Sequence, residues 1–217
     1  MHNDLFRETI QRTAAGERKY IRFLEGRGHF AHLLLQLTPT PGQPCAIVSS
    51  PSLPIPEDCR QAAHATLQQR LQQGPLHGLP FYGFELRLTG GTFRPPYSNP
   101  EAFSAVAAMA FDEVLREAHP LLIERWTGII LNVTPYALAA VLSEITTLLG
   151  KVNIEITQRS HFKLRLPVPV RLIDIFRTAF AVRNIETFPL PVAERYRPAL
   201  NPPFSANAPK RGYEDFT

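Results

Sequence analysis

The stretch Gly26–Leu33, which reads GRGHFAHL, follows the alternating segment KYIRFLE (19–25) and leads into the apolar segment AHLLLQL (31–37). Alternation of apolar and charged residues is typical of a half-buried β-strand, and glycines between two such segments are typical of a turn. We therefore predict a β-hairpin in which Gly26 and Gly28 supply the turn dihedral angles. The arginine and two histidines of the stretch leave three functions open: a metal site, a phosphate-binding turn, or a turn presented to RNA.

The composition is that of an ordinary globular protein of 217 residues, with 44% hydrophobic and 19% charged residues. This length allows one large domain or two small ones, each with a core of its own. Lysine and arginine number 23 and aspartate and glutamate 19, so the formal net charge is +4 at pH 7. A small positive excess permits a polyanionic partner without requiring one.

The cysteines and the apolar segments indicate the cellular compartment. Cys45 and Cys59 have no C-x-x-C spacing, which predicts reduced thiols and neither a disulfide framework nor a zinc knuckle. The N-terminus has no apolar core of signal-peptide length, and no apolar run reaches the roughly 18 residues that a membrane span needs. We expect a cytoplasmic protein that makes no membrane contact.

Apolar periodicity predicts the elements around the hairpin. Before it, a short solvated helix is expected, flanked by the cations Arg7, Arg12, Arg18 and Lys19. After it, we predict a strand at 44–49, a helix at 57–73, a strand at 80–88 that ends at Gly90-Gly91, and a long helix that ends near Ala118. Ser98 and Glu101, three residues apart, fit a capping box at the start of that long helix.

A second unit follows the break at His119-Pro120. Its predicted elements are a strand at 123–133, a helix from Thr134 to Gly150, strands at 152–158 and 161–168 joined by a turn at Arg159-Ser160, a helix at 171–182 and a strand at 185–190. The order βαββαβ is the split βαβ arrangement of ferredoxin-like folds. The tail from Arg195 to Thr217 is rich in proline and asparagine, and we expect it to be mobile.

Several of these segments resemble the C-terminal part of elongation factor G and its relatives, the ribosomal translocases and ribosomal-protection proteins. GRGHFAH is similar to the glycine-arginine-glycine turn at the start of domain IV. LPIPEDCRQAAHATLQQRLQQGPLHGLPFYGFELRLTGG is similar to the helix, connector and strand that follow, and PEAFSAVAAMAFDEVLREAHPLLIERW to the long helix and the entry to domain V. GKVNIEITQRSHFKLRLPVPV resembles the strand-hairpin-strand of domain V, and the likeness extends over residues 15–198.

The resemblance implies an α+β fold, with a β-α-β RNA-facing domain at 1–120 similar to domain IV, a ferredoxin-like domain at 121–198 similar to domain V, and a flexible tail at 199–217. It also implies a partner, the ribosome or ribosomal RNA, and a role in translation without a cofactor. No G-x-x-x-x-G-K-[ST] motif occurs in the sequence. We therefore expect GTP hydrolysis to need a separate GTPase-domain protein.

The second loop of the domain IV tip departs from the family pattern, which usually reads aspartate-glycine-serine-tyrosine-histidine followed by an acidic turn. Here the loop is TGGTFRPPYSNPEAF (89–103), with Arg94 where the histidine usually lies and Pro95-Pro96-Tyr97 in place of the acidic turn. In the first loop, His29 stands where a glutamine is common. We therefore expect no translocation activity from this tip, even with a GTPase domain supplied by another chain.

Four residues of the two loops are the candidate RNA-binding residues: Arg27, His29, Arg94 and Tyr97. A guanidinium can pair with phosphate or stack on a base, and an arginine beside an aromatic ring suits stacking on unpaired bases. The stiff Pro-Pro sequence lowers the entropy lost on binding. If the two loops meet at one end of the domain, the four side chains form one basic and aromatic tip. The alternative is a turn and a loop with only structural roles.

A second basic group alternates along the predicted hairpin of the second unit; its members are Lys151, Arg159, Lys163 and Arg165. It forms either a solvated face or a face that contacts RNA phosphates, with an affinity that falls as salt rises. His29 and His32 lie three residues apart, which on a strand places them on opposite faces, so we expect no metal site. No serine lies in a G-x-S-x-G context, and we expect no enzyme activity.

Three alternatives to a stand-alone RNA-binding protein stay open. The chain could be half of a split translation factor whose GTPase domain is another polypeptide, which an apolar patch at 1–18 would favour. It could be a protein-interaction scaffold that has lost ribosome binding. It could also be a metal-dependent enzyme that uses His29 and His32. The oligomeric state does not follow from the sequence.

Overall fold

The computed structural model describes residues 5–24, 26–158, 161–182, 185–189 and 195–200. The chain divides into two compact units: the first is Arg7–Leu122, and the second begins at Ile123 and also takes in residues 5 and 6. Each unit has its own hydrophobic core and combines strands with helices, which confirms the predicted α+β fold class. Within the described ranges, no helix is both long enough and apolar enough to cross a membrane.

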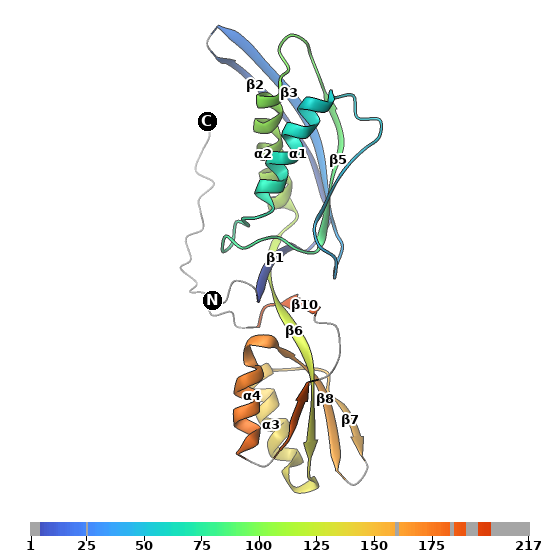
Figure 1. Ribbon diagram of the computed structural model, residues 1–217, viewed down its shortest axis with the longest axis vertical. Coiled ribbons are helices and arrows are strands. Elements are labelled where there is room, and N and C mark those ends of the chain that lie inside the picture. The colour runs from blue at the N-terminus through green and yellow to red at the C-terminus, as the bar shows by residue number, and fades with distance from the viewer. Residues whose placement is uncertain (1–4, 25, 159–160, 183–184, 190–194, 201–217) are drawn as a thin grey trace. The chain divides into compact units, whose positions relative to one another are not determined.

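The first unit is built on a four-stranded sheet with two helices on one face (Figure 1). Its elements are β1 (Phe6–Ile10), β2 (Ala14–Leu24), β3 (Arg27–Pro39), β4 (Ala46–Ser49), α1 (Glu57–Arg70), β5 (Phe84–Thr92) and α2 (Pro100–Glu117). The strand order is β2-β3-β5-β4, in which β3 is antiparallel to both neighbours and β4 is parallel to β5. Helix α2 packs against β2 and β3, and α1 packs against α2.

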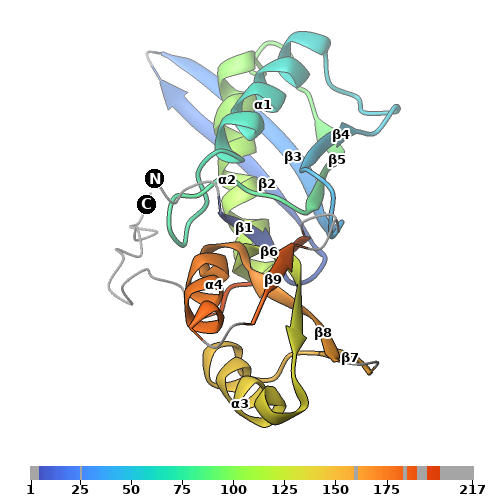
Figure 2. The same ribbon diagram turned by 60° about the horizontal axis from the view of Figure 1, so that its bottom comes forward.

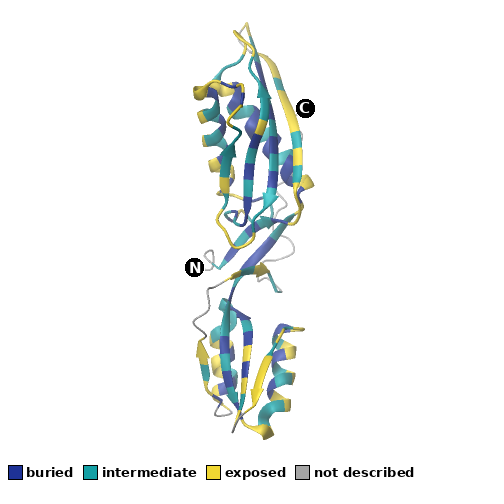
Figure 3. Cartoon of the chain, turned by 90° about the vertical axis from the view of Figure 1, so that its right-hand side faces the viewer, coloured by how far each residue is buried: buried dark blue, intermediate teal, exposed yellow. Residues whose placement is uncertain are grey.

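The core of this unit follows from the two-residue period of β3. Alternate residues from Ala31 to Leu37 are buried in one cluster with the buried residues of both helices, and the residues between them are only partly buried (Figure 3). Side chains of a strand alternate between its two faces, so one face of β3 packs on the helices and the other is open. The open face is the one that carries Gly28, Phe30 and His32.

The predicted hairpin is confirmed, with strands longer than the sequence indicated. Gly26 lies in the turn with φ of 78°, as predicted, whereas Gly28 has no positive φ and belongs to β3. The prediction that Gly28 supplies a turn angle is therefore wrong. The predicted strand end at Gly90-Gly91 is also wrong, because β5 continues through both glycines as far as Thr92.

A one-residue irregularity in β5 reverses its alternation. Leu35 of β3 pairs with Leu88 and Leu34 pairs with Gly90, so Thr89 is left out of the ladder, and its hydroxyl donates instead to the Leu34 carbonyl at 3.2 Å. An extra residue in one strand exchanges the faces of all residues that follow it. Past this point, residue 93 faces the helices and residue 94 faces the open side.

The N-terminal segment forms strands, and the predicted solvated helix flanked by Arg7, Arg12, Arg18 and Lys19 is wrong. The physical reason lies in the spacing of the buried residues, because Phe6, Glu8 and Ile10 are all buried in β1. A period of two is the period of a strand, whereas a helix would bury residues three or four apart. The charged residues of β2 lie on a strand at the edge of the sheet.

Glu8 is a fully buried carboxylate whose partners are backbone amides. Its two oxygens accept hydrogen bonds from the N–H groups of Leu76 (3.0 Å), His77 (2.9 Å) and Leu79 (3.2 Å) in the loop between α1 and β5. A buried carboxylate is tolerated where several donors replace its water shell. Glu8 therefore holds this loop in place, because its carboxylate accepts the hydrogen bonds that backbone carbonyls accept in regular secondary structure.

Helix α2 begins with a different cap from the predicted one. The side chain of Asn99 accepts a hydrogen bond from the Ala102 N–H at 2.8 Å, which satisfies one of the unpaired donors of the first turn. The hydroxyl of Ser98 points elsewhere and donates to the Phe30 carbonyl at 2.8 Å. The predicted capping box of Ser98 and Glu101 is therefore wrong, because the Ser98 hydroxyl bonds to β3 and not to the first turn of α2.

The second unit is a ferredoxin-like βαββαβ unit, as predicted. Its elements are β6 (Pro120–Val133), the 3-10 turn Pro135–Ala137, α3 (Leu138–Leu149), β7 (Glu155–Gln158), β8 (Phe162–Pro169), the 3-10 turn Val170–Leu172, α4 (Ile173–Ala181), β9 (Thr187–Pro189) and β10 (Arg195–Pro198). β9 and β8 flank β6, and β7 pairs with β8, all antiparallel. Helices α3 and α4 share a core with the alternating residues Leu164, Leu166 and Val168 of β8.

The end of the described chain is anchored to this unit. β10 pairs with β6, and the buried Glu124 accepts hydrogen bonds from the Arg171 guanidinium at 2.8 Å and from the Leu200 N–H. Arg171 in turn donates to the Leu200 carbonyl. The expectation of a mobile tail from Arg195 is therefore wrong for residues 195–200. The predicted tail at 201–217 and the predicted turn at Arg159-Ser160 lie outside the described residues.

Both cysteines are free thiols, and Cys45 lies just before the edge strand β4. Burial raises the pKa of the Cys45 thiol to about 11, although backbone hydrogen bonds to Phe84 and Gly83 act in the opposite direction. The thiolate is the reactive form of cysteine. Cys45 is therefore an unreactive thiol near neutral pH.

We predict that Glu8→Ala lowers the free energy of unfolding by about 2–5 kcal/mol, because each orphaned buried donor costs about 1–3 kcal/mol. Urea denaturation followed by circular dichroism measures this change, and amide exchange of Leu76, His77 and Leu79 should accelerate. Glu117→Ala is the control, since its side chain is 70% exposed in an ion pair at 3.7 Å. Equal stability of the two variants would contradict the structural role of Glu8.

We predict that alkylation of Cys45 by iodoacetamide, measured in a Cys59→Ala background, keeps rising with pH up to about pH 11. An ordinary thiol with pKa 9.0 would reach half of its maximal rate at pH 9 and level off near pH 10, so at pH 8 Cys45 should react about a hundredfold more slowly. The urea-unfolded chain is the control and should show the ordinary profile. A midpoint near pH 9 in the folded protein would contradict the burial of this thiol.

Candidate nucleic-acid interface

The loop after β5 is fastened to the outer end of β3 by two hydrogen bonds, and a third joins two residues within the loop. The Phe30 N–H donates to the Tyr97 carbonyl at 2.8 Å, and the Ser98 hydroxyl donates to the Phe30 carbonyl at 2.8 Å. The same hydroxyl accepts from the Arg94 N–H at 2.8 Å. The two loops that the sequence analysis singled out therefore meet, and loop 93–98 continues the ladder where β5 has ended.

Arg94 lies over an aromatic ring on the open face. Its guanidinium carbon is 4.6 Å from the centroid of the Phe30 ring, which is cation–π geometry. The preceding residue, Phe93, turns to the helix side and stacks on Phe103 with ring centroids 6.5 Å apart. Among the described residues, no carboxylate lies within ion-pair distance of Arg94. The cation is therefore positioned by a ring and still available to an anion.

Tyr97 lies across the backbone of Gly28. A Cβ placed on Gly28 would be only 3.0 Å from Cδ1 of the Tyr97 ring, so a larger residue there would displace the ring. The Tyr97 side chain is 52% exposed. Gly28 thus allows a close approach of side chain to backbone, which is a different reason from the turn angle predicted for it.

His29 is tied to the start of α2. The Asn99 Nδ2 donates to His29 Nδ1 at 2.9 Å, while Asn99 Oδ1 is occupied by the Ala102 N–H. Because Nδ1 accepts this bond, the ring proton of His29 resides on Nε2. His29 faces the helix side of β3 and is partly buried, so one of its nitrogens is committed to the fold.

Arg27, the remaining predicted tip residue, is exposed at the first position of β3. It pairs with Leu24 across the hairpin and has the same parity as His29, so it belongs to the helix side. The structure therefore brings all four predicted residues to one end of the unit, but on two faces: Arg94 and Tyr97 over the open face, and Arg27 and His29 on the other.

A pocket of about 700 Å³ opens at this end, and sequence reasoning missed most of its wall. Its lining residues are Ile21, Arg22, Phe23, Gly28, His29, Phe30, Phe93, Arg94, Pro95 and Tyr97. Ile21 lies opposite Phe30 and Phe23 lies opposite Gly28 in the β2–β3 ladder. The alternation of KYIRFLE predicts a strand but not whether its apolar side chains are covered, and Ile21 and Phe23 are 71% and 77% exposed.

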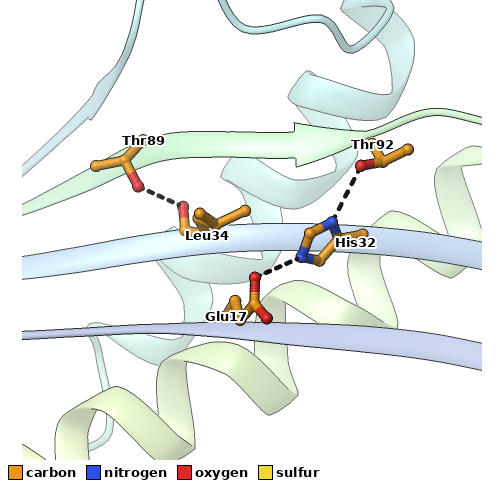
Figure 4. A network of polar contacts seen from close by, with 5 residues as sticks. All are labelled: Glu17, His32, Leu34, Thr89 and Thr92. Atoms are coloured by element: carbon orange, nitrogen blue, oxygen red, sulfur yellow. Dashed lines mark hydrogen bonds and ion pairs between the residues drawn. The ribbon is translucent and has the colours of Figure 1, made fainter.

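His32 occupies the open face further along β3, whereas His29 faces the helix side. Figure 4 shows His32 between Glu17 and Thr92. Its Nε2 lies 3.1 Å from Glu17 Oε2 on β2, and its Nδ1 lies 3.0 Å from the Thr92 hydroxyl on β5. Both ring nitrogens are thus used to link three strands. In the part of the chain that the structure describes, no three His, Cys, Asp or Glu residues form a group that could hold a metal ion.

The second basic group is only partly brought together. Lys163 and Arg165 are exposed on β8, on the face opposite the buried Leu164 and Leu166. Lys151 is exposed just after α3, outside any strand. Arg159 lies outside the described residues. Two cations therefore share one sheet face of the second unit.

Comparison with known proteins gives one match to the first unit and others that cover most of the chain. Residues 5–119 match the sequence profile of elongation factor G, domain IV. The elongation factor G of Thermotoga maritima is 28% identical over 184 residues, which are 83% of this chain and 26% of that protein. The elongation factor G of Thermotoga neapolitana is 27% identical over the same shares. The chain thus spans about a quarter of the length of these curated relatives.

A solved structure from Thermus thermophilus shares the fold, with a TM-score of 0.64 and 22% identity over 89% of this chain and 30% of that one. The profile match covers more than half of the residues and contains the hairpin, both helices and the loop fastened to Phe30. This chain belongs to the elongation factor G family, and its first unit corresponds to domain IV of that family.

Proposed function

We propose that this chain binds ribosomal RNA through the outer end of its first unit and acts in translation without catalytic chemistry of its own. The observation that carries the proposal is the junction of the two loops at Phe30, which gathers the four candidate residues at one end of the sheet. Among the described residues, those that line the pocket include two arginines and a histidine and no acid. A basic, aromatic end suits RNA, in which unpaired bases stack on such side chains between phosphates.

The second unit is proposed to be a domain V, with a boundary near residue 120 and an end near residue 198. Two observations support this assignment. The unit has the ferredoxin-like βαββαβ order, and the alignment with elongation factor G covers 83% of the chain, which is more than the domain IV match alone. Lys163 and Arg165 on its open sheet face, with Lys151 and Arg159, are proposed to contact RNA phosphates.

A separate GTPase-domain protein is a further proposed partner, since the split-factor alternative predicts one. The apolar patch that would favour docking at residues 1–18 finds no support in the described part of that segment, where Phe6 and Ile10 are buried. We therefore propose the ribosome as the primary partner and the cytoplasm as the place of action. A protein-interaction scaffold would bind neither ribosomes nor RNA, and the experiment below distinguishes the two.

We predict that the purified chain co-sediments with ribosomes and that the affinity falls with salt. Removing two phosphate contacts in Arg27→Ala/Arg94→Ala should lower the slope of log affinity against log salt by about 2, since each contact contributes about 1. Arg60→Ala/Arg177→Ala removes the same charge elsewhere and is the matched control, since both arginines form i,i+3 ion pairs on helix surfaces. Identical slopes for the two double variants would reject the tip, and no binding by the wild-type chain near physiological salt would reject the function.

For the second unit, we predict that Lys163→Ala/Arg165→Ala also lowers the salt slope of ribosome binding by about 1–2. Both side chains are exposed on β8, so neither change should affect folding. The same Arg60→Ala/Arg177→Ala protein serves as the control for the loss of two charges. A slope equal to that of the control would mean that this face of the sheet is merely solvated.

A further inference from the structure

The exposed apolar side chains of the first unit gather at one place. Among the described residues of that unit, the large hydrophobic side chains that are exposed are Ile21, Phe23 and Tyr97, and all three line the pocket at the hairpin end. Single exposed hydrophobic residues are ordinary, whereas a cluster around a concave surface indicates a binding site. The fold gains nothing from leaving Phe23 77% exposed, so a ligand is the simplest reason for its place.

Gly28 lets two aromatic side chains of this cluster approach the same point of the strand. Phe23 lies opposite Gly28 in the β2–β3 ladder and therefore on the same face, and the Tyr97 ring contacts Gly28 from the side of the loop. Because Gly28 has no side chain, the Tyr97 ring lies close against its backbone and forms one wall of the pocket, beside Phe23. The next pair along the ladder, Ile21 and Phe30, closes the pocket, and the Phe30 ring is covered by Arg94.

The charges of this face indicate an anionic occupant. Arg94 lies at the pocket, and Lys19 lies on the same face of β2 as Ile21, two residues away. Two acids of this face are already paired, Glu17 with His32 and Glu85 with Arg87, and Glu17 lies beyond Lys19. A ligand that fits must therefore present a flat apolar ring and a negative charge close to it, which is the chemistry of a nucleotide.

We infer that this pocket receives one unpaired nucleobase of RNA, stacked between Phe23 and Tyr97, with a neighbouring phosphate at Arg94. The inference rests on the proposed RNA-binding tip and adds the site where a base is held. Recognition by stacking is tolerant of sequence, because every base has an aromatic face. A base inside a duplex is not available to such a site, so the pocket selects single-stranded RNA.

The test is a titration of the full chain with a six-nucleotide single-stranded RNA that carries one 2-aminopurine between uridines. Stacking on Phe23 and Tyr97 should quench the 2-aminopurine fluorescence. Phe23→Ala and Tyr97→Ala should each weaken binding roughly 5- to 150-fold, the range that corresponds to 1–3 kcal/mol per stacked base. Because neither change removes a charge, the salt dependence should stay the same. Phe23→Tyr keeps the ring and should keep the affinity.

Two controls separate pocket binding from general effects. Tyr136→Ala removes a ring that is 99% exposed in the second unit and should leave the affinity unchanged. The same oligonucleotide annealed to its complement should bind more weakly and without quenching. Circular dichroism of the variants checks the fold, which should be intact because Phe23 and Tyr97 lie outside the core cluster.

The outcomes distinguish this inference from the proposed function. Wild-type affinity in Phe23→Ala and Tyr97→Ala, together with a lost salt slope in Arg27→Ala/Arg94→Ala, would overturn the base pocket and leave the RNA-binding tip in place. Oligonucleotide binding that depends on Phe23, without any ribosome binding, would support the pocket and overturn the ribosomal function.

Loss of ribosome binding in Phe23→Ala with unchanged oligonucleotide affinity would assign the pocket to a ribosomal protein. A self-association removed by Phe23→Ala would assign it to a second copy of the chain. Either of these last two results overturns the inference.

Discussion

The two-residue period of β3 is the constraint on which the rest of the first unit depends. Because successive side chains of a strand face opposite ways, packing Ala31, Leu33 and the residues that continue this series against the helices commits every intervening residue to the open face. A slip of one residue would bury His32 and expose Leu33. The burial of several leucines therefore fixes, at a distance, which face Gly28 and Phe30 present at the far end of the strand.

The irregularity at Thr89 carries this constraint into the neighbouring strand. With an unbroken alternation, β5 would leave the sheet with residue 93 on the open face and residue 94 toward the helices. The extra residue exchanges them, so that Phe93 stacks on Phe103 and Arg94 covers Phe30. One unpaired residue thus places an apolar ring in the core and a cation at the pocket. The Thr89 hydroxyl donates to the Leu34 carbonyl, which gives this backbone acceptor a hydrogen bond at the irregularity in the ladder.

The sequence predicted well whatever depends on local periodicity, including the hairpin, both long helices and the βαββαβ order of the second unit. It failed where a distant partner decides. Ser98 and Glu101 have the spacing of a capping box, but the Phe30 carbonyl, 68 positions earlier, takes the Ser98 hydroxyl and leaves Asn99 to cap the helix. The burial of Glu8 could not be predicted from the sequence, because the N–H groups that bond to it lie 68 to 71 positions away.

The candidate site divides in the same way. Arg94 and Tyr97 could be named from the sequence, because a guanidinium and a phenol ring in a stiff loop have a chemistry that does not depend on neighbours. Ile21 and Phe23 could not be named, because an alternating strand reads the same whether its apolar face is covered or bare. Only the arrangement of the helices decides this: α2 packs on the face opposite to them, and nothing in the described unit covers theirs.

The hydrogen bonds of the tip further separate residues that serve the fold from those that are free to bind. Nδ1 of His29 is hydrogen-bonded to Asn99, and both ring nitrogens of His32 are bonded to Glu17 and Thr92. A ligand that used these nitrogens would have to replace hydrogen bonds that the fold already makes. The Arg94 guanidinium lies over the face of a ring, and within the described residues no acceptor takes up its N–H donors. The proposed recognition at this end therefore rests on Arg94 and the exposed aromatic rings, whereas the two histidines belong to the scaffold that positions them.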